Sequence, residues 1–130
     1  MALRSLIVDD NAHFLRAARD LLERQGMVVV GVASTGDEAL QRAQELQPDV
    51  TLVDIDLGDE SGFDVVERLV AAKGLERSYV VLISTYAEND FADLIAASPA
   101  VGFLTKTELS GSAISELVAR ARDGDRADPA

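Results

Sequence analysis

The chain has 130 residues, 48% of them hydrophobic, which is enough to bury one core and argues against disorder. It has no cysteine, which excludes a disulfide framework, a zinc–thiolate site and a thiol nucleophile. The net charge of −11 repels nucleic-acid phosphates, so direct binding of nucleic acid by this chain is not expected. The sequence shows neither a targeting peptide nor an apolar stretch of ~20 residues, so we expect a cytoplasmic protein without membrane association.

In the first half of the chain, apolar runs alternate with amphipathic stretches. The runs are rich in β-branched residues and predict buried strands, and the amphipathic stretches repeat apolar residues at helical spacing. We predict strands at 3–8, 27–33 and 50–53 and helices at 12–25 and 37–46.

The second half of the chain repeats this alternation. We predict helices at 61–72, 88–97 and 110–122, strands at 79–84 and 101–104, and a polar tail at 123–130. Five strand–helix units with near-continuous apolar strands predict an α/β fold, in which a doubly wound parallel sheet is covered on both faces. The chain is therefore expected to form one domain, residues 1–122, followed by the tail.

Polar residues collect where the predicted strands end. In an open parallel sheet, ligands bind outside the carboxyl ends of the strands, so these residues are the candidates for a site. They are Asp9, Asp10, Asp54, Asp56, Ser84, Thr85 and Lys106.

The three carboxylates Asp9, Asp10 and Asp54 would repel one another unless a cation lay between them. Oxygen ligands without cysteine or histidine suit a hard ion such as Mg²⁺, which keeps open positions for phosphoryl oxygens. The Lys106 ammonium and the Ser84 hydroxyl could contact the remaining phosphoryl oxygens. The set therefore favours phosphoryl-transfer chemistry.

Each residue taken alone also has a purely structural interpretation. Asp10 could be the N-cap of the first helix, and Asp54 a turn residue. Ser84 could be a buried hydroxyl bonded to backbone, and Lys106 a solvated lysine. Their coincidence at one edge of one sheet weakens these alternatives. The single histidine, His13, is expected to be an exposed helix residue.

Five segments together resemble the receiver domain of bacterial two-component response regulators, over about residues 3–122. They are LIVDDN at 6–11, VDIDL at 53–57, Gly62, VVLIST at 80–85 and GFLTK at 102–106. The resemblance implies a flavodoxin-like (βα)5 fold with strand order 2-1-3-4-5. It also implies a phosphoprotein that takes a phosphoryl group from a sensor histidine kinase and catalyses its own phosphorylation and dephosphorylation, without being an enzyme in the usual sense.

The resemblance also implies roles for particular residues. Asp54 matches the phosphoacceptor, Asp9 and Asp10 match the acidic pair that binds Mg²⁺ together with Asp54, and the backbone carbonyl of Asp56 is a further metal ligand. Ser84 and Lys106 match the groups that contact the phosphoryl group. Thr85 and Phe103 take the switch positions, and the face made by helix 88–97, strand 101–104 and helix 110–122 would bind an output partner or a second copy.

The sequence departs from the family pattern at three positions. Thr107 follows Lys106, where a proline after a cis peptide bond is common, Thr85 replaces a smaller residue, and Gly58 stands where proline is frequent. None of these changes removes a required group. Because Thr85 is bulkier than the residue common at this position, we expect it to narrow access to Asp54 and to affect the rate of phosphorylation.

Three other functions remain open at this stage. A magnesium phosphohydrolase of the haloacid-dehalogenase type would carry its DxD motif on the first strand, whereas Asp54-Ile55-Asp56 follows the third. A pseudo-receiver acting only in docking would lack the acid set, and a flavodoxin-like cofactor binder would need a phosphate-binding loop after the first strand. The start of the chain and its short tail favour a stand-alone receiver over one excised from a DNA-binding regulator.

Overall fold

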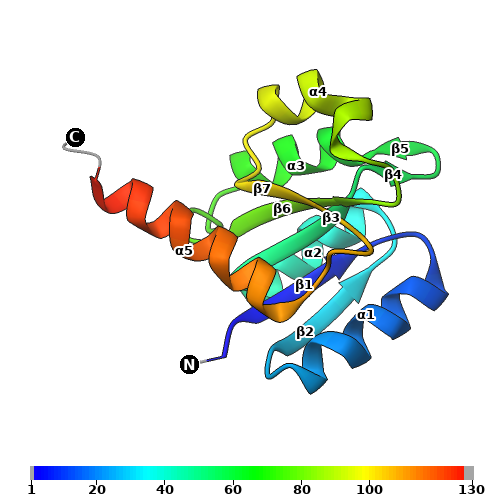
Figure 1. The fold of residues 1–130 in the computed structure, drawn as a ribbon, viewed down its shortest axis with the longest axis horizontal. Helices are drawn as coiled ribbons and strands as arrows, with labels where there is room; N and C mark the ends of the chain where they lie inside the picture. The colour runs from blue at the N-terminus through cyan, green and yellow to red at the C-terminus, as the bar shows by residue number, and fades with distance from the viewer. Residues whose placement is uncertain (1, 128–130) are drawn as a thin grey trace.

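The computed structural model describes residues 2–127, and five parallel strands form its main sheet (Figure 1). The strand order is β2-β1-β3-β6-β7, which is the expected order 2-1-3-4-5 of the main strands. This confirms the α/β, doubly wound architecture. The strands are β1 (Arg4–Val8), β2 (Val28–Ala33), β3 (Val50–Asp54), β6 (Tyr79–Ser84) and β7 (Gly102–Thr105).

Helices cover both faces of this sheet (Figure 1). Helices α1 and α5 pack on one face, and α2 and α3 pack on the other, with α4 beyond them near β7. The helices are α1 (Ala12–Arg24), α2 (Gly36–Leu46), α3 (Gly62–Ala71), α4 (Ala92–Ala97) and α5 (Gly111–Ala127). Right-handed crossovers put helices on both faces because the chain moves outward from β1 to β2 and then in the opposite direction from β3 to β7.

The central strands β1, β3 and β6 are largely apolar because both of their faces are buried. On β1, Leu6 and Val8 point into the core under α2 and α3, whereas Ile7 points into the core under α1 and α5. On β3, Val53 and Leu52 divide between the same two cores. This alternation leaves the strand ends as the place where polar groups can meet solvent.

Three regions differ from the prediction. A two-stranded antiparallel hairpin of β4 (Asp56–Leu57) and β5 (Glu60–Ser61) was not foreseen, and Gly58 turns it with a φ of 76°. The predicted helix 88–97 is a 3₁₀ turn, η1 (Glu88–Phe91), followed by the short α4. Helix α5 continues to Ala127, so residues 123–127 of the predicted tail are helical, and residues 128–130 lie outside the described part.

Across residues 2–127, no helix combines the length and the apolar character that crossing a membrane requires.

Candidate functional site

The carboxyl ends of β1, β3, β6 and β7 meet at one edge of the sheet, and their polar residues line a pocket there. Parallel pairing places Val8 beside Val53 and Asp54 beside Ile83, so the residues that follow these strands lie close together. The pocket has a volume of about 200 Å³ and is lined by Asp9, Asp10, Asn11, Asp54, Asp56, Ser84, Thr85, Tyr86 and Lys106. All seven predicted strand-end residues therefore contribute to one pocket.

Three of these side chains, those of Asp9, Asp54 and Ser84, are buried. The side chain of Lys106 is 16% exposed, and its Nζ lies 2.7 Å from Asp9 Oδ2 and 2.8 Å from Asp54 Oδ2. The interpretation of Lys106 as a solvated lysine is therefore wrong. Its ammonium lies between two buried carboxylates because an unpaired charge at this depth would be costly.

Burial raises the pKa of Asp9 from 3.8 to about 6, because desolvation disfavours the carboxylate. The ion pair with Lys106 and the hydrogen bond from the Asn11 amide oppose this rise, while the neighbouring Asp54 carboxyl adds to it. Burial also disfavours the Lys106 ammonium, but its contacts with Asp54 and Asp9 outweigh this effect and raise its pKa. The pocket therefore holds a lysine that stays cationic and an acid that is sensitive to its surroundings.

The segment after β3 wraps around Asp54. Asp54 Oδ1 accepts a hydrogen bond of 2.9 Å from the Asp56 amide, so it has a partner within its own loop. Asp56 is exposed, and its Oδ1 accepts from Gly58 N at 3.1 Å. A Cβ at Gly58 would lie 3.0 Å from Asp10 Oδ2, so this glycine lets the hairpin approach the exposed Asp10.

Gly62 lets helix α3 begin directly against the backbone of Asp54. Its amide donates to Ile55 O at 2.8 Å, and a Cβ at this position would lie only 1.9 Å from Asp54 O. Any side chain here would have to push the two backbones apart. Gly62 formed part of the sequence resemblance, but the reason for a glycine at this position appears only in the packing.

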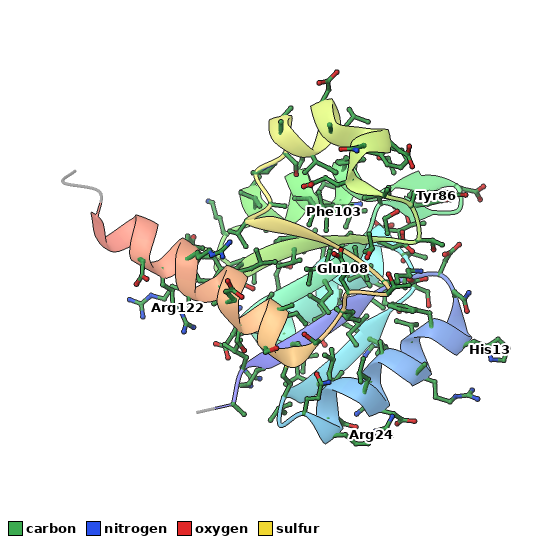
Figure 2. The ribbon with its side chains drawn as sticks, viewed as in Figure 1. His13, Arg24, Tyr86, Phe103, Glu108 and Arg122 are labelled. Carbon is green, nitrogen blue, oxygen red and sulfur yellow. The ribbon has the colours of Figure 1, made fainter. Side chains whose placement is uncertain are left out.

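On the other side of Asp54, the end of β6 presents a hydroxyl. Ser84 Oγ accepts a hydrogen bond from the Tyr86 amide at 2.9 Å, so Ser84 is a buried hydroxyl bonded to backbone, as one of the sequence-based interpretations had it. The proton of this hydroxyl stays available to a ligand. Thr85 and Tyr86 are exposed at the rim of the pocket. Phe103 on β7 is half-buried and packs against the core on the α2–α3 side (Figure 2).

Two residues at the start of α1 were missed by the sequence analysis, its N-cap Asn11 and Phe14 in its first turn. Asn11, not Asp10, is the N-cap of α1: its Oδ1 accepts from His13 N and Phe14 N, and its own amide donates to Asp9 Oδ1 at 2.8 Å. The Phe14 ring lies against the Lys106 ammonium, 4.1 Å from Nζ to the ring centroid. Asparagine after two aspartates is a visible cap signal, whereas the Phe14 contact has no signal in the sequence. His13 is exposed, as predicted (Figure 2).

Among residues 2–127, no group of three or more acidic or histidine side chains is already arranged to hold a metal ion. The donor set nevertheless fits a hard cation. Asp9 Oδ2 is buried and, within the described residues, has the Lys106 ion pair but no hydrogen bond of its own. Asp54 and the exposed Asp10 line the same pocket and offer further carboxylate oxygens, the ligands that Mg²⁺ prefers.

The chain matches the family model described as "Response regulator receiver domain" over residues 5–120. Among solved structures, a two-component response regulator of the LuxR family from Aurantimonas sp. SI85-9A1 is 25% identical with a TM-score of 0.80, covering 92% of this chain and 86% of that chain. The response regulator domain of Thermotoga maritima CheB is 28% identical with a TM-score of 0.72, covering 99% and 100%.

Among curated proteins, the chain is 31% identical over 118 residues to the response regulator GacA of Pseudomonas viridiflava, covering 89% of this chain and 52% of GacA. It is 34% identical over 135 residues to a protein-glutamate methylesterase/protein-glutamine glutaminase of Thermotoga maritima, covering 98% of this chain and 38% of that protein. The chain thus spans about half or less of the length of these relatives. The family match covers all of the sheet except Arg4 and every strand-end residue of the pocket, and the chain belongs to the response regulator receiver domain family.

Proposed function

We propose that this receiver accepts a phosphoryl group on Asp54 from a sensor histidine kinase of a two-component phosphorelay. The observation that carries this proposal is the Asp54 carboxylate at the end of the central strand, 2.8 Å from the Lys106 ammonium in a pocket lined by further acids. In the transfer, an Asp54 oxygen bonds to phosphorus while the bond from phosphorus to the histidine nitrogen breaks, and that nitrogen keeps the electron pair. Because such kinases use ATP, the proposed place of action is the cytoplasm.

The side chains of the pocket have separate tasks in this proposal. Lys106 neutralises charge on the phosphoryl oxygens, and the Ser84 hydroxyl donates its proton to one of them. The side chains of Asp9, Asp10 and Asp54 and the carbonyl of Asp56 would hold Mg²⁺. When bound, Mg²⁺ supplies positive charge beside the phosphoryl oxygens. Phosphoryl transfer depends mainly on positioning and charge neutralisation, which this set provides.

The second part of the proposal is a switch. Ser84 and Lys106 lie at the ends of β6 and β7, so contacts of both with a phosphoryl group pull on these two strands. Thr85 and the half-buried Phe103 lie on the same strands or directly after them. We infer that phosphorylation repacks the face formed by α4, β7 and α5, through which the protein binds a second copy or an output protein or domain.

The other functions considered from the sequence have less support. The family match argues against a phosphohydrolase of the haloacid-dehalogenase type and a flavodoxin-like cofactor binder. A pseudo-receiver would not need the paired buried acids and lysine, whose desolvation is costly. An active phosphoacceptor therefore remains the preferred function.

Labelling with acetyl phosphate tests the proposal. The wild-type protein should take up label in the presence of Mg²⁺, and Asp54→Asn and an excess of EDTA should each reduce uptake to background. Asp64→Asn is a matched control, because Asp64 is an exposed aspartate on α3 outside the pocket. This variant should label like the wild type. Equal labelling of Asp54→Asn and wild type would assign the phosphoryl group to another residue.

A further inference from the structure

Phe14 and Lys106 come from distant parts of the chain and meet at the edge of the pocket. Phe14 lies in the first turn of α1, which connects β1 to β2. Lys106 follows β7, the edge strand at the opposite end of the sheet from β2. The Lys106 Nζ lies 4.1 Å from the centroid of the Phe14 ring, a distance typical of a cation–π interaction. The same Nζ contacts Asp9 and Asp54, so the ring and two carboxylates surround the ammonium.

The position of Phe14 is itself tied to the pocket. Asp9 Oδ1 accepts from the Asn11 amide at 2.8 Å, and Asn11 Oδ1 accepts from the Phe14 amide at 3.2 Å. Asp9 Oδ2 pairs with Lys106, and Lys106 in turn contacts Phe14. Each of the four residues Asp9, Asn11, Phe14 and Lys106 therefore contacts the next, and the last contacts the first. One carboxylate thus fixes both the start of α1 and the lysine, and the Phe14 ring joins the two.

We propose that Phe14 is a positioning residue that holds the Lys106 ammonium over Asp54 in readiness for the incoming phosphoryl group. The proposal rests on the proposed function of Asp54. Lysine is a flexible side chain that loses much rotamer freedom when it is fixed in one place. The half-buried ring covers one side of the ammonium, attracts its charge and leaves it facing the carboxylates. The Lys106 side chain therefore loses little further rotamer freedom when the phosphoryl group arrives.

The placement can be tested without any phosphoryl donor. The chain has only two lysines, Lys73 and Lys106, so selective ¹³C labelling of lysine yields two sets of side-chain signals. Ring current from Phe14 should shift the Lys106 methylene protons upfield of those of the exposed Lys73. Phe14→Leu should abolish this shift, whereas Phe14→Tyr should keep it. Phe91→Leu, an equal loss of an aromatic ring on the other face of the sheet, should leave it unchanged.

The effect on reactivity is measured as the rate of labelling by acetyl phosphate with Mg²⁺. Phe14→Leu should slow labelling by roughly threefold to tenfold, the range expected for one cation–π contact, while Phe14→Tyr should restore the wild-type rate. In a Lys106→Met background, Phe14→Leu should cause no further loss, because the ring acts through the lysine.

Two results would overturn the role of Phe14. One is that Phe14→Leu slows labelling by the same factor in the wild-type and Lys106→Met backgrounds. The other is that the Lys106 signal of the folded wild-type protein is not shifted upfield. Failure of the proposed function has a different signature, since the wild type would then take up no label while the Lys106 signal still shifted upfield.

Discussion

The edge of the sheet that carries Asp54 and the segment that forms η1 and α4 differ sharply in packing. At the edge, Asp9, Asp54 and Ser84 are buried, and each is held by hydrogen bonds or ion pairs. By contrast, none of residues 88–97, all of which the structure describes, is buried, and Leu94 is 54% exposed. The segment touches the core only through partly buried side chains such as Phe91 and Ile95.

This difference matches the two tasks of the proposed function. Phosphoryl transfer requires groups held in place before the reaction, which the buried strand ends provide. A switch requires a segment that can change its packing at low cost, and such segments are those with few buried apolar contacts. Phe103 is half-buried and lines a pocket together with Glu88 and Asn89 of η1, so in the proposed switch it would respond to a change in the packing of this segment.

The largest expected effect comes from equal truncations in the two regions. Leu52 on β3 is fully buried, so Leu52→Ala should lower the free energy of unfolding by about 2–5 kcal/mol through lost burial and a cavity. Leu94→Ala removes the same atoms from α4 and should cost at most about 0.5 kcal/mol. Urea denaturation measures both values. Similar losses for the two variants would show that α4 is as firmly packed as the sheet.

A smaller effect is expected on how the free energy of unfolding depends on pH, through Asp9 in the pocket. The pKa of Asp9 in the folded protein, about 6, lies above its ordinary value of 3.8. Its contribution to stability is therefore complete below pH 3.8 and is lost as the pH rises through about 6. In metal-free buffer, raising the pH from 5 to 7.5 should destabilise the wild type relative to Asp9→Asn by about 1–1.5 kcal/mol.

The comparison of the two Asp9 proteins cancels the effects of the other acids. Glu76 and Glu108 have lowered pKa values and contribute stability that is lost as the pH falls, but they are common to both proteins. Urea denaturation at the two pH values gives the relevant difference. If the difference in stability between wild type and Asp9→Asn stayed constant, Asp9 would be ionised over the whole range.

The smallest expected effect is a change in amide chemical shifts, and it tests most directly whether the pocket and the α4 segment are coupled. Amide chemical shifts of the free protein and of its complex with beryllofluoride and Mg²⁺ should differ at Asp9, Asp10 and Asp54. They should also differ across residues 84–106, because in the proposed function Ser84 and Lys106 would contact the phosphoryl mimic from the ends of β6 and β7. Changes confined to the three aspartates would mean that the α4 segment does not respond to the site.

The sequence by itself determined the main architecture and the location of the pocket. Strands buried on both faces must be apolar along most of their length, so they stand out from amphipathic helices without any knowledge of the fold. Parallel strands bring their carboxyl ends to one edge, so Asp54, Ser84 and Lys106 could be expected there together. Register and pairing in the structure agree with this expectation.

Only the tertiary structure decided the details that depend on contacts between distant segments. The apolar spacing of residues 88–97 predicted one helix, but without a buried face to stabilise it the segment splits into η1 and α4. Gly62 is required because α3 begins against the backbone of Asp54, and Phe14 meets Lys106 because α1 begins and β7 ends beside the same pocket. Such contacts leave no periodic trace in the sequence, since each depends on the placement of two elements rather than on the pattern of one.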